Sequence, residues 1–372
     1  MAKIKFVVLH PAGSNADIAK DECQIPYTLS CIENVDATVV ACHIDRDCPN
    51  AIHVPGLLIK HIPFIINNAL TGAIYLLFNS RKIDWLNIYF AGRQAYLWMT
   101  IYKFFNRKGH VYLKLDMDFR GCDLYDTNER ERIVFKKNTE KADIVSVESY
   151  AIKDRIQKYS EKELLIVEDG ISRVIAKPNL HKKRGNTFIT AARLGTYQKA
   201  TDILLEAFEK SSKYHNWTLK LIGNIDSDFE EAIAKFFNDY PDMRKRVVFT
   251  GPINDREQLY DEFYSAKVFV LPSRWESFGI AAAEALSCGC YLILSDTIPP
   301  AKEMTDCFRY GELVESENVN SLMNALISAS QREYSQREID DMIRYADYQF
   351  SWKRICKNLF DEMQNIMENG DL

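Results

Sequence analysis

The chain has 372 residues, which is too long for a single hydrophobic core and predicts two domains. Its 47 Lys and Arg against 52 Asp and Glu give a formal net charge of −5, which argues against a nucleic-acid-binding protein. Nine cysteines, an odd number without a CxxC pair, predict reduced thiols in a cytoplasmic compartment rather than a disulfide framework.

Strand and helix patterns alternate along the whole chain. Short apolar runs predict strands at 4–9, 37–42, 86–90, 110–115, 143–147, 164–167, 187–191, 218–222, 246–249, 267–271, 291–294 and 312–314. Such alternation is typical of parallel sheets covered by helices on both faces, and two successive sets predict an α/β protein with two doubly wound, Rossmann-like domains. We expect domains at 1–170 and 171–349, with a hinge after Gly170.

The amino-terminal segment MAKIKFVVLHPAG predicts a first strand within a few residues of Met1. It lacks the charged, apolar and cleavage regions of a signal peptide, so we expect the protein to stay in the cytoplasm. The loop after this strand contains Gly13, whose backbone amides could help to shape a ligand cleft.

A basic and aromatic region surrounds the third predicted strand. Between Arg81 and Lys114 there are seven Lys or Arg, one acidic residue and nine aromatic residues. The segment 93–108, RQAYLWMTIYKFFNRK, predicts a helix that would suit peripheral docking on anionic lipid headgroups. The alternative is a helix packed on the sheet with its lysines extended to water. The preceding apolar run contains Pro63 and Gly72, which argues against a transmembrane span.

Two aspartates follow the strand HVYLKL. Asp116 and Asp118 have the DxD form in which two carboxylates can hold Mg²⁺ or Mn²⁺ against a phosphate. For Asp116, a satisfied loop aspartate is the equally plain alternative, because Asp often caps turns.

Two cations lie after the strand TFITA. Arg193 follows the strand, and Lys199 precedes apolar residues at helical spacing. If both face one cleft, they and the amides at a helix start can stabilise a diphosphate without a metal. The alternative is an exposed pair of surface cations.

The most informative segment is ESFGIAAAE, which comes directly after the strand-like run KVFVLPS. Glu276 lies in the predicted loop at the carboxyl end of the strand, where open α/β sheets bind ligands. Glu284 lies about two turns into the next helix, so the two carboxylates suit the two ends of one extended ligand. Close packing of this alanine-rich helix would bury Glu284, which then needs a partner such as sugar hydroxyls.

The block PSRWESFGIAAAEALSCG resembles the motif of the family 4 retaining glycosyltransferases. TFITAARLG with Lys199, the loop SDTIPPAKEM and the strand LLIVEDGIS are also similar to segments of that family, although Asp169 stands where an Asn is usual. The resemblance implies the GT-B fold, with two Rossmann-like domains facing across a cleft. It also implies a terminal helix, at about 350–372, that crosses back to the first domain.

The resemblance implies roles for most of the candidate residues. Arg193 and Lys199 would bind the diphosphate of a nucleotide sugar, and Glu284 the ribose. The donor sugar would contact Glu276 and the amides of Ser277, Phe278 and Gly279, and the base would pack at Gly223, Gly251 and Ile253. Asp116 would face the donor sugar or the acceptor hydroxyl, although Leu115 occupies the position of the histidine that often precedes it. The two cations would replace a metal, so no metal and no cofactor are expected.

The expected activity is therefore sugar transfer, with retained configuration, from a UDP- or GDP-sugar to a glycan or polyprenyl-diphosphate-linked acceptor. The pathway would be surface polysaccharide synthesis, such as capsule or O-antigen, at the inner face of the cell membrane. The alternative is a nucleotide-sugar-binding or regulatory protein without transferase activity. A Rossmann dehydrogenase is disfavoured, because LHPAGSNADIAK lacks the GxGxxG loop.

Overall fold

The computed structural model describes residues 3–32, 34–45, 48, 54–171 and 184–370. The chain divides into two compact units, Met1–Ser172 with Phe350–Leu372, and Arg173–Gln349. The segment in which we expect the hinge, after Gly170, falls largely on residues 172–183, which lie outside the described residues.

The first unit is built on a seven-stranded parallel sheet with the order β3-β2-β1-β4-β5-β6-β7. Its strands are β1 (Ile4–Leu9), β2 (Val35–Ala41), β3 (Leu58–His61), β4 (Trp85–Tyr89), β5 (His110–Lys114), β6 (Ile144–Val147) and β7 (Leu165–Ile166). The chain winds first to one side of β1 and then to the other, so the strand order reverses between β1 and β4. This reversal makes the sheet doubly wound.

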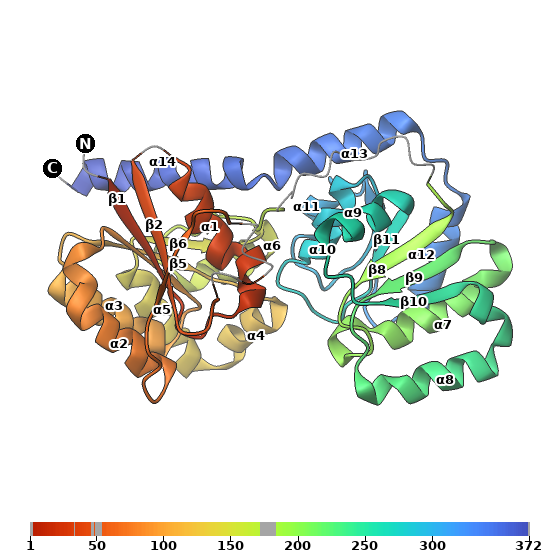
Figure 1. Ribbon diagram of the computed structural model, residues 1–372, viewed down its shortest axis with the longest axis horizontal. Coiled ribbons are helices and arrows are strands. Elements are labelled where there is room, and N and C mark those ends of the chain that lie inside the picture. The colour runs from red at the N-terminus through yellow and green to blue at the C-terminus, as the bar shows by residue number, and fades with distance from the viewer. Residues whose placement is uncertain (1–2, 33, 46–47, 49–53, 172–183, 371–372) are drawn as a thin grey trace. The chain divides into compact units, whose positions relative to one another are not determined.

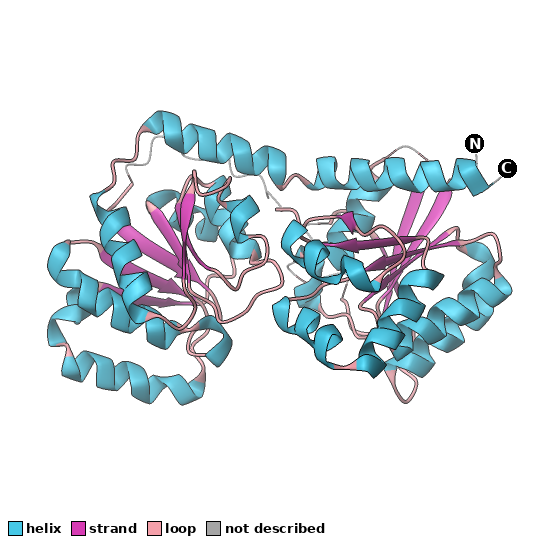
Figure 2. Ribbon diagram, turned by 180° about the vertical axis from the view of Figure 1, so that it is seen from behind, coloured by secondary structure: helices cyan, strands magenta, loops and turns pink. Residues whose placement is uncertain are grey.

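Helices cover both faces of this sheet (Figure 2). They are α1 (Asp21–Ser30), α2 (Asn68–Asn79), α3 (Arg93–Phe105), α4 (Phe119–Thr127), α5 (Glu129–Lys141), α6 (Tyr150–Ile156) and α14 (Trp352–Gly370). The core on one face contains α1 and α14, and the core on the other contains apolar residues of α2 to α6.

The carboxyl-terminal helix α14 packs beside α1, although the two are far apart in sequence (Figure 1). Its buried side chains recur every three or four residues, as one face of a helix requires. They are Trp352, Ile355, Cys356, Leu359, Phe360 and Met363. The predicted terminal helix that returns to the first domain is therefore confirmed.

The second unit has a six-stranded parallel sheet with the order β10-β9-β8-β11-β12-β13. Its strands are β8 (Thr187–Ala191), β9 (Thr218–Ile222), β10 (Val247–Gly251), β11 (Val268–Leu271), β12 (Tyr291–Ser295) and β13 (Gly311–Val314). Its helices are α7 (Thr201–Ser211), α8 (Glu230–Asp239), α9 (Arg256–Ser265), α10 (Ile280–Ser287), α11 (Ala301–Met304), α12 (Val319–Gln331) and α13 (Gln336–Gln349). The order reverses between β8 and β11, so this sheet is doubly wound as well.

The predicted strands agree with the structure within about two residues at each end, and one strand was missed. β3 lies at the edge of its sheet, where three of its four residues are exposed. Such a strand needs no apolar run, so its sequence LIKH carried no signal. None of the helices in the described part of the chain combines the length and apolar composition that a membrane span requires.

Candidate functional site

The candidate site of the second unit lies at the reversal between β8 and β11. Loops that follow two strands at such a point diverge and leave a crevice at the carboxyl edge of the sheet. The loop after β8 carries Arg193 and Lys199, and the loop after β11 carries Glu276. Hydrogen bonds join these loops, among them one from the Arg274 amide to the Gln198 carbonyl at 2.8 Å and one from Gln198 Nε2 to the Trp275 carbonyl at 3.0 Å.

Glu276 and Lys199 form an ion pair between these two loops. Glu276 is only 8% exposed, and its Oε1 accepts hydrogen bonds from Lys199 Nζ and, at 2.7 Å, from Ser273 Oγ. The structure thus brings together a cation and a carboxylate that the sequence analysis had assigned to different parts of a ligand. An incoming anion can attract Lys199 only in competition with Glu276, so the two side chains are coupled.

Arg193 is exposed, and its Nη2 donates to Gln198 Oε1 at 2.9 Å. A second arginine in this region, Arg274, was missed by the sequence analysis. It donates to Asp202 at 2.9 Å and to the Tyr197 carbonyl at 2.6 Å, and its guanidinium lies 4.0 Å from the centre of the Tyr197 ring. These contacts hold the Arg274 guanidinium between the two loops. Arg193 is therefore the arginine that is more accessible to a ligand.

Glu284 is buried in α10, as predicted, but its partner is a protein side chain. It is 4% exposed and accepts a hydrogen bond from Arg256 Nη2. The expectation that a buried Glu284 needs a partner is met in the free protein by Arg256, and its contact with sugar hydroxyls stays a prediction. Glu284 is also the fifth residue of α10, little more than one turn from its start rather than two. Arg256 opens α9 after β10, and no sequence signal linked it to α10.

We expect Arg256→Ala to weaken nucleotide binding about tenfold. The substitution leaves a buried carboxylate without the charge-assisted hydrogen bond that fixes its position, which is worth about 1.5–3 kcal/mol. Isothermal titration with UDP and GDP measures the affinity, and thermal unfolding separates it from a loss of fold. Arg256→Lys should recover part of the affinity, and the exposed Arg337→Ala should have no effect. Unchanged affinity in Arg256→Ala would show that the pair is only structural.

Residues 277–279, directly before α10, differ in what they contribute to the site. Gly279 has φ +90° and marks the start of the helix, a conformation that favours glycine. Phe278 is only 1% exposed, so its side chain belongs to the core. Ser277, in the loop between β11 and α10, is half-buried. Of these three residues, the backbone amides and the Ser277 hydroxyl are the groups that can reach a ligand.

The two candidate glycines for base packing lie side by side at the ends of β9 and β10. The Gly223 amide donates to the Gly251 carbonyl at 3.0 Å. A Cβ on Gly223, at φ +139°, would lie 1.8 Å from the Ala192 carbonyl oxygen, so this position accepts no side chain. Gly251, at φ +74°, has open space around it, and Ile253 beyond it is half-buried.

The DxD pair of the first unit does not act as a pair. Asp118 caps α4 by accepting from the Gly121 amide at 3.0 Å and also binds Arg120. Asp116 follows the buried Leu115, is half-buried, and has one buried oxygen, Oδ1, without a hydrogen-bond partner. Asp118 is thus a helix-capping residue, whereas Asp116, for which a satisfied loop position was the alternative, keeps one carboxylate oxygen without a hydrogen-bond partner.

Gly13 lies in a tight turn after β1. Its amide donates to the His10 carbonyl at 2.9 Å, and a Cβ would come within 2.5 Å of the His10 ring. Within the described residues, the one group of His, Cys and acidic side chains close enough to hold a metal is His10, Asp17 and Glu22. Asp17 already pairs with Lys20 at 2.7 Å, and this cation opposes a second one.

A buried ionic cluster at the carboxyl edge of the first sheet escaped the sequence analysis. Lys114, at the end of β5, is fully buried. Its Nζ lies 2.9 Å from Glu148, 3.2 Å from Asp169 and 3.5 Å from Asp21. Burial alone would lower the pKa of Lys114, but the carboxylates raise it well above its ordinary value. The signal was available, because a lysine inside an apolar strand needs a buried partner.

The carboxyl groups of this cluster outnumber their cation. Burial raises the pKa of Asp169 to about 7 and the pKa values of Asp21 and Glu148 well above the ordinary range, although Lys114 opposes the shift. One ammonium group cannot balance three buried carboxylates. At neutral pH the cluster therefore retains protons on part of its carboxyl groups.

Comparison with known proteins identifies the relatives of the chain. A family model described as glycosyl transferases group 1 matches residues 172–348. An uncharacterized glycosyltransferase of Haemophilus influenzae is 27% identical over 154 residues, 41% of this chain and 42% of that protein. The GDP-mannose:cellobiosyl-diphosphopolyprenol alpha-mannosyltransferase of Xanthomonas oryzae is 31% identical over 138 residues, 34% of this chain and 35% of that protein. The matched part thus spans less than half the length of either relative.

Solved structures extend the likeness over nearly the whole chain. The structure of Anabaena HepE in complex with UDP has a TM-score of 0.73 at 15% identity and covers 98% of this chain and 100% of that one. At this identity the likeness concerns the fold alone. Residues 172–348 thus match the glycosyl transferases group 1 family, and the likeness to solved structures shows that the chain has the GT-B fold.

Proposed function

We propose that this protein transfers a sugar from a UDP- or GDP-sugar to a glycan or lipid-linked acceptor, with retention of configuration and without a metal. The observation that carries the proposal is the pairing of Lys199 with Glu276, beside the exposed Arg193, at the strand reversal of the second unit. Cations held on two loops at this edge suit a nucleoside diphosphate, whose negative charge grows as the sugar departs.

In this proposal, the donor changes the partners of the site. The diphosphate draws Lys199 from Glu276, and Arg193 offers a planar fork to phosphate oxygens. Glu276, released from the lysine, accepts hydrogen bonds from the hydroxyls of the donor sugar, and Glu284 accepts from the ribose. The base packs at Gly223 and Gly251. The charge that a divalent ion would otherwise supply comes from the two side-chain cations.

The names of relatives suggest the substrate class. HepE has been solved with UDP, and the Xanthomonas relative is named for a GDP-mannose donor and a diphosphopolyprenol-linked acceptor. We extend this to a nucleotide-diphosphate donor and to an acceptor in surface polysaccharide synthesis at the inner face of the cell membrane. Asp116 in the first unit, with its unpartnered Oδ1, is our candidate for contact with the acceptor hydroxyl.

The proposal is tested by incubating the protein with a panel of UDP-, GDP- and ADP-sugars and measuring release of the nucleoside diphosphate, with and without glycan acceptors. We expect release from one UDP- or GDP-sugar. The same rate is expected in EDTA, because Lys199 and Arg193 supply the positive charge. Activity lost in EDTA and restored by Mn²⁺ would contradict the metal-free part of the proposal.

The second candidate function is binding of a nucleotide sugar without transfer, because the same residues serve both. It is favoured by the ion pairs that hold Lys199 with Glu276 and Arg256 with Glu284, since these fix the side chains without a ligand. Tight binding of a nucleotide sugar in a thermal-shift assay, with no release of diphosphate on any acceptor, would support this alternative.

A further inference from the structure

Exposed apolar side chains are concentrated on one part of the first unit. Of 19 large hydrophobic residues exposed in the described chain, ten lie between positions 58 and 104. The most exposed are Ile66 at 80%, Phe78 at 78% and Phe104 at 73%. Solvent-exposed side chains of this size are normal singly, whereas a group of them marks an interaction site.

Two neighbouring helices, α2 and α3, carry six of these ten residues. α2 and α3 pack together where Trp98 Nε1 donates to the Ala69 carbonyl at 2.8 Å and the Trp98 ring fills the space above Gly72. Their inner faces are buried in the core. Their exposed positions include five apolar side chains, Leu70, Leu77 and Phe78 on α2 and Leu97 and Phe104 on α3, beside the polar Arg93, Gln94 and Thr100 of α3. We call these five residues the outer α2–α3 face.

Positive charge surrounds the outer α2–α3 face. The sequence from 57 to 109 contains seven Lys or Arg and a single acidic residue, Asp84. Arg81 and Lys82 after α2, and Arg107 and Lys108 after α3, are all exposed. These four cations lie near Phe78 and Phe104, at the carboxyl ends of the two helices.

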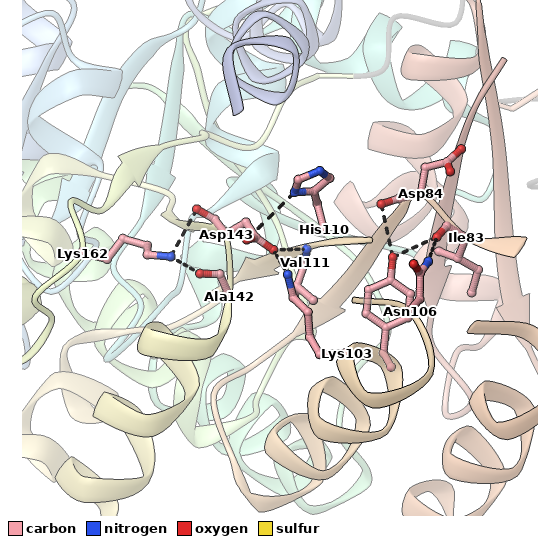
Figure 3. Close-up of polar contacts among 10 residues, drawn as sticks. Ile83, Asp84, Lys103, Asn106, His110, Val111, Ala142, Asp143 and Lys162 are labelled. Carbon is pink, nitrogen blue, oxygen red and sulfur yellow. Dashed lines mark hydrogen bonds and ion pairs between the residues drawn. The ribbon is translucent and has the colours of Figure 1, made fainter. Parts of the chain in front are cut away.

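Lys103 does not belong to this charged group. Its Nζ donates to Asp143 Oδ2 at 2.6 Å, and the same carboxylate oxygen accepts from the Val111 amide at 2.7 Å (Figure 3). Asn106 likewise turns toward the sheet and donates to the Ile83 carbonyl at 2.7 Å. These bonds fasten the end of α3 to the sheet, so the outer face is held on a rigid support.

We propose that the outer α2–α3 face docks on an anionic lipid bilayer, with Phe78 and Phe104 entering the interface and Arg81, Lys82, Arg107 and Lys108 binding headgroup phosphates. Aromatic and leucine side chains partition into this zone, and each nearby cation strengthens binding to anionic lipid. A second copy of the chain is a poorer occupant. In a twofold dimer the same surface of each copy forms the interface, so the cations around the outer α2–α3 face of one copy would lie close to those of the other.

This inference names the surface on which the proposed lipid-linked acceptor would arrive, and it rests on the proposed function only for that acceptor. α2 and α3 begin near the carboxyl ends of β3 and β4, the edge at which α/β sheets bind ligands. Phe64 and Ile66, exposed by 50% and 80%, precede α2 at that edge. Apolar contact with a membrane therefore extends from the ligand edge along the length of α2.

The test is co-sedimentation of the full chain with vesicles of phosphatidylcholine alone and of phosphatidylcholine with phosphatidylglycerol. We expect binding only to the anionic vesicles, and salt should weaken that binding.

The double variant Phe78→Ser, Phe104→Ser should lower the partition coefficient about tenfold or more, because both aromatic rings that contact the bilayer are lost. Replacing Arg81, Lys82, Arg107 and Lys108 by Gln should lower it about fivefold per charge. Tyr214→Ser with Tyr348→Ser, two exposed aromatics of the second unit, is the matched control and should bind as the wild type does.

Thermal-shift assays of the same variants with UDP and GDP separate this inference from the proposed function. The substitutions leave the second unit unchanged, so the stabilisation by nucleotide should be the same as in the wild type. Vesicle binding without donor turnover would uphold the docking surface and contradict the transferase. Turnover without binding to anionic vesicles would do the reverse. A wild-type dimer in sedimentation velocity that the Phe78→Ser, Phe104→Ser variant converts to monomer would overturn the inference in favour of a second copy.

Discussion

Lys199→Ala is expected to lower kcat about 10²–10³-fold while the fold remains intact. In the proposed reaction, Lys199 stabilises charge that develops on the departing diphosphate, and loss of one such preorganised donor typically costs this much. The side chain is 15% exposed at the end of a loop, so its removal opens no large core cavity. Single-turnover rates with the preferred donor, together with thermal unfolding, measure the two effects separately.

The ion pair between Lys199 and Glu276 also predicts how substitutions of the two residues combine. Lys199 and Glu276 hold each other in the free protein, so their contributions to catalysis are not independent. We expect Glu276→Ala to reduce kcat by a similar factor. The kcat of the double variant should be only slightly lower than that of the less active single variant. The exposed Lys213→Ala, in the same unit, should keep full activity. Full additivity of the two losses would contradict the coupled site.

The sequence predicted those parts of the molecule whose physics is local. Apolar runs marked the buried strands of both sheets, and the motif around Glu276 could be placed because a strand end and a helix start flank it. Its partner Lys199 is 77 residues away in the sequence, and their contact depends on β8 lying beside β11. Strand order, which no single segment encodes, created that pair.

The same limit explains the missed partners. Glu284 was recognised as buried, but Arg256 reaches it from a helix after another strand. Lys114, Glu148 and Asp169 lie at or just after the carboxyl ends of three successive strands of the first sheet, and only their common edge brings them together. Side-chain exposure was equally unreadable, because the helix 93–108 contains both the buried Trp98 and the exposed Phe104.

Lys114→Met is expected to destabilise the protein by about 3–5 kcal/mol at pH 8, because breaking a buried ion pair leaves uncompensated charge in the core. Here the substitution removes an ammonium group that lies within 3.5 Å of three carboxyl groups. Urea unfolding measures the change. Lys136→Met, at an exposed lysine that pairs with Glu161, is the control and should stay within about 0.5 kcal/mol of wild type. Wild-type stability in Lys114→Met would contradict the cluster.

The pH dependence of the wild type provides the complementary test, with Asp169→Asn as the variant. The folded-state pKa of Asp169, about 7, lies above its ordinary value of 3.8, so the folded protein binds the proton more tightly than the unfolded chain does. This contribution to stability is complete below about pH 4 and is lost as the pH rises through about 7. We therefore expect the free energy of unfolding to fall between pH 5 and pH 8, and Asp169→Asn to flatten that fall.

Asp154→Asn, at an exposed position of α6, is the control and should keep the wild-type dependence of stability on pH. If Asp169→Asn also kept the wild-type dependence, Asp169 would not be the group that holds the proton. The destabilisation by Lys114→Met should likewise shrink at pH 5, where protonated carboxyl groups no longer need the ammonium.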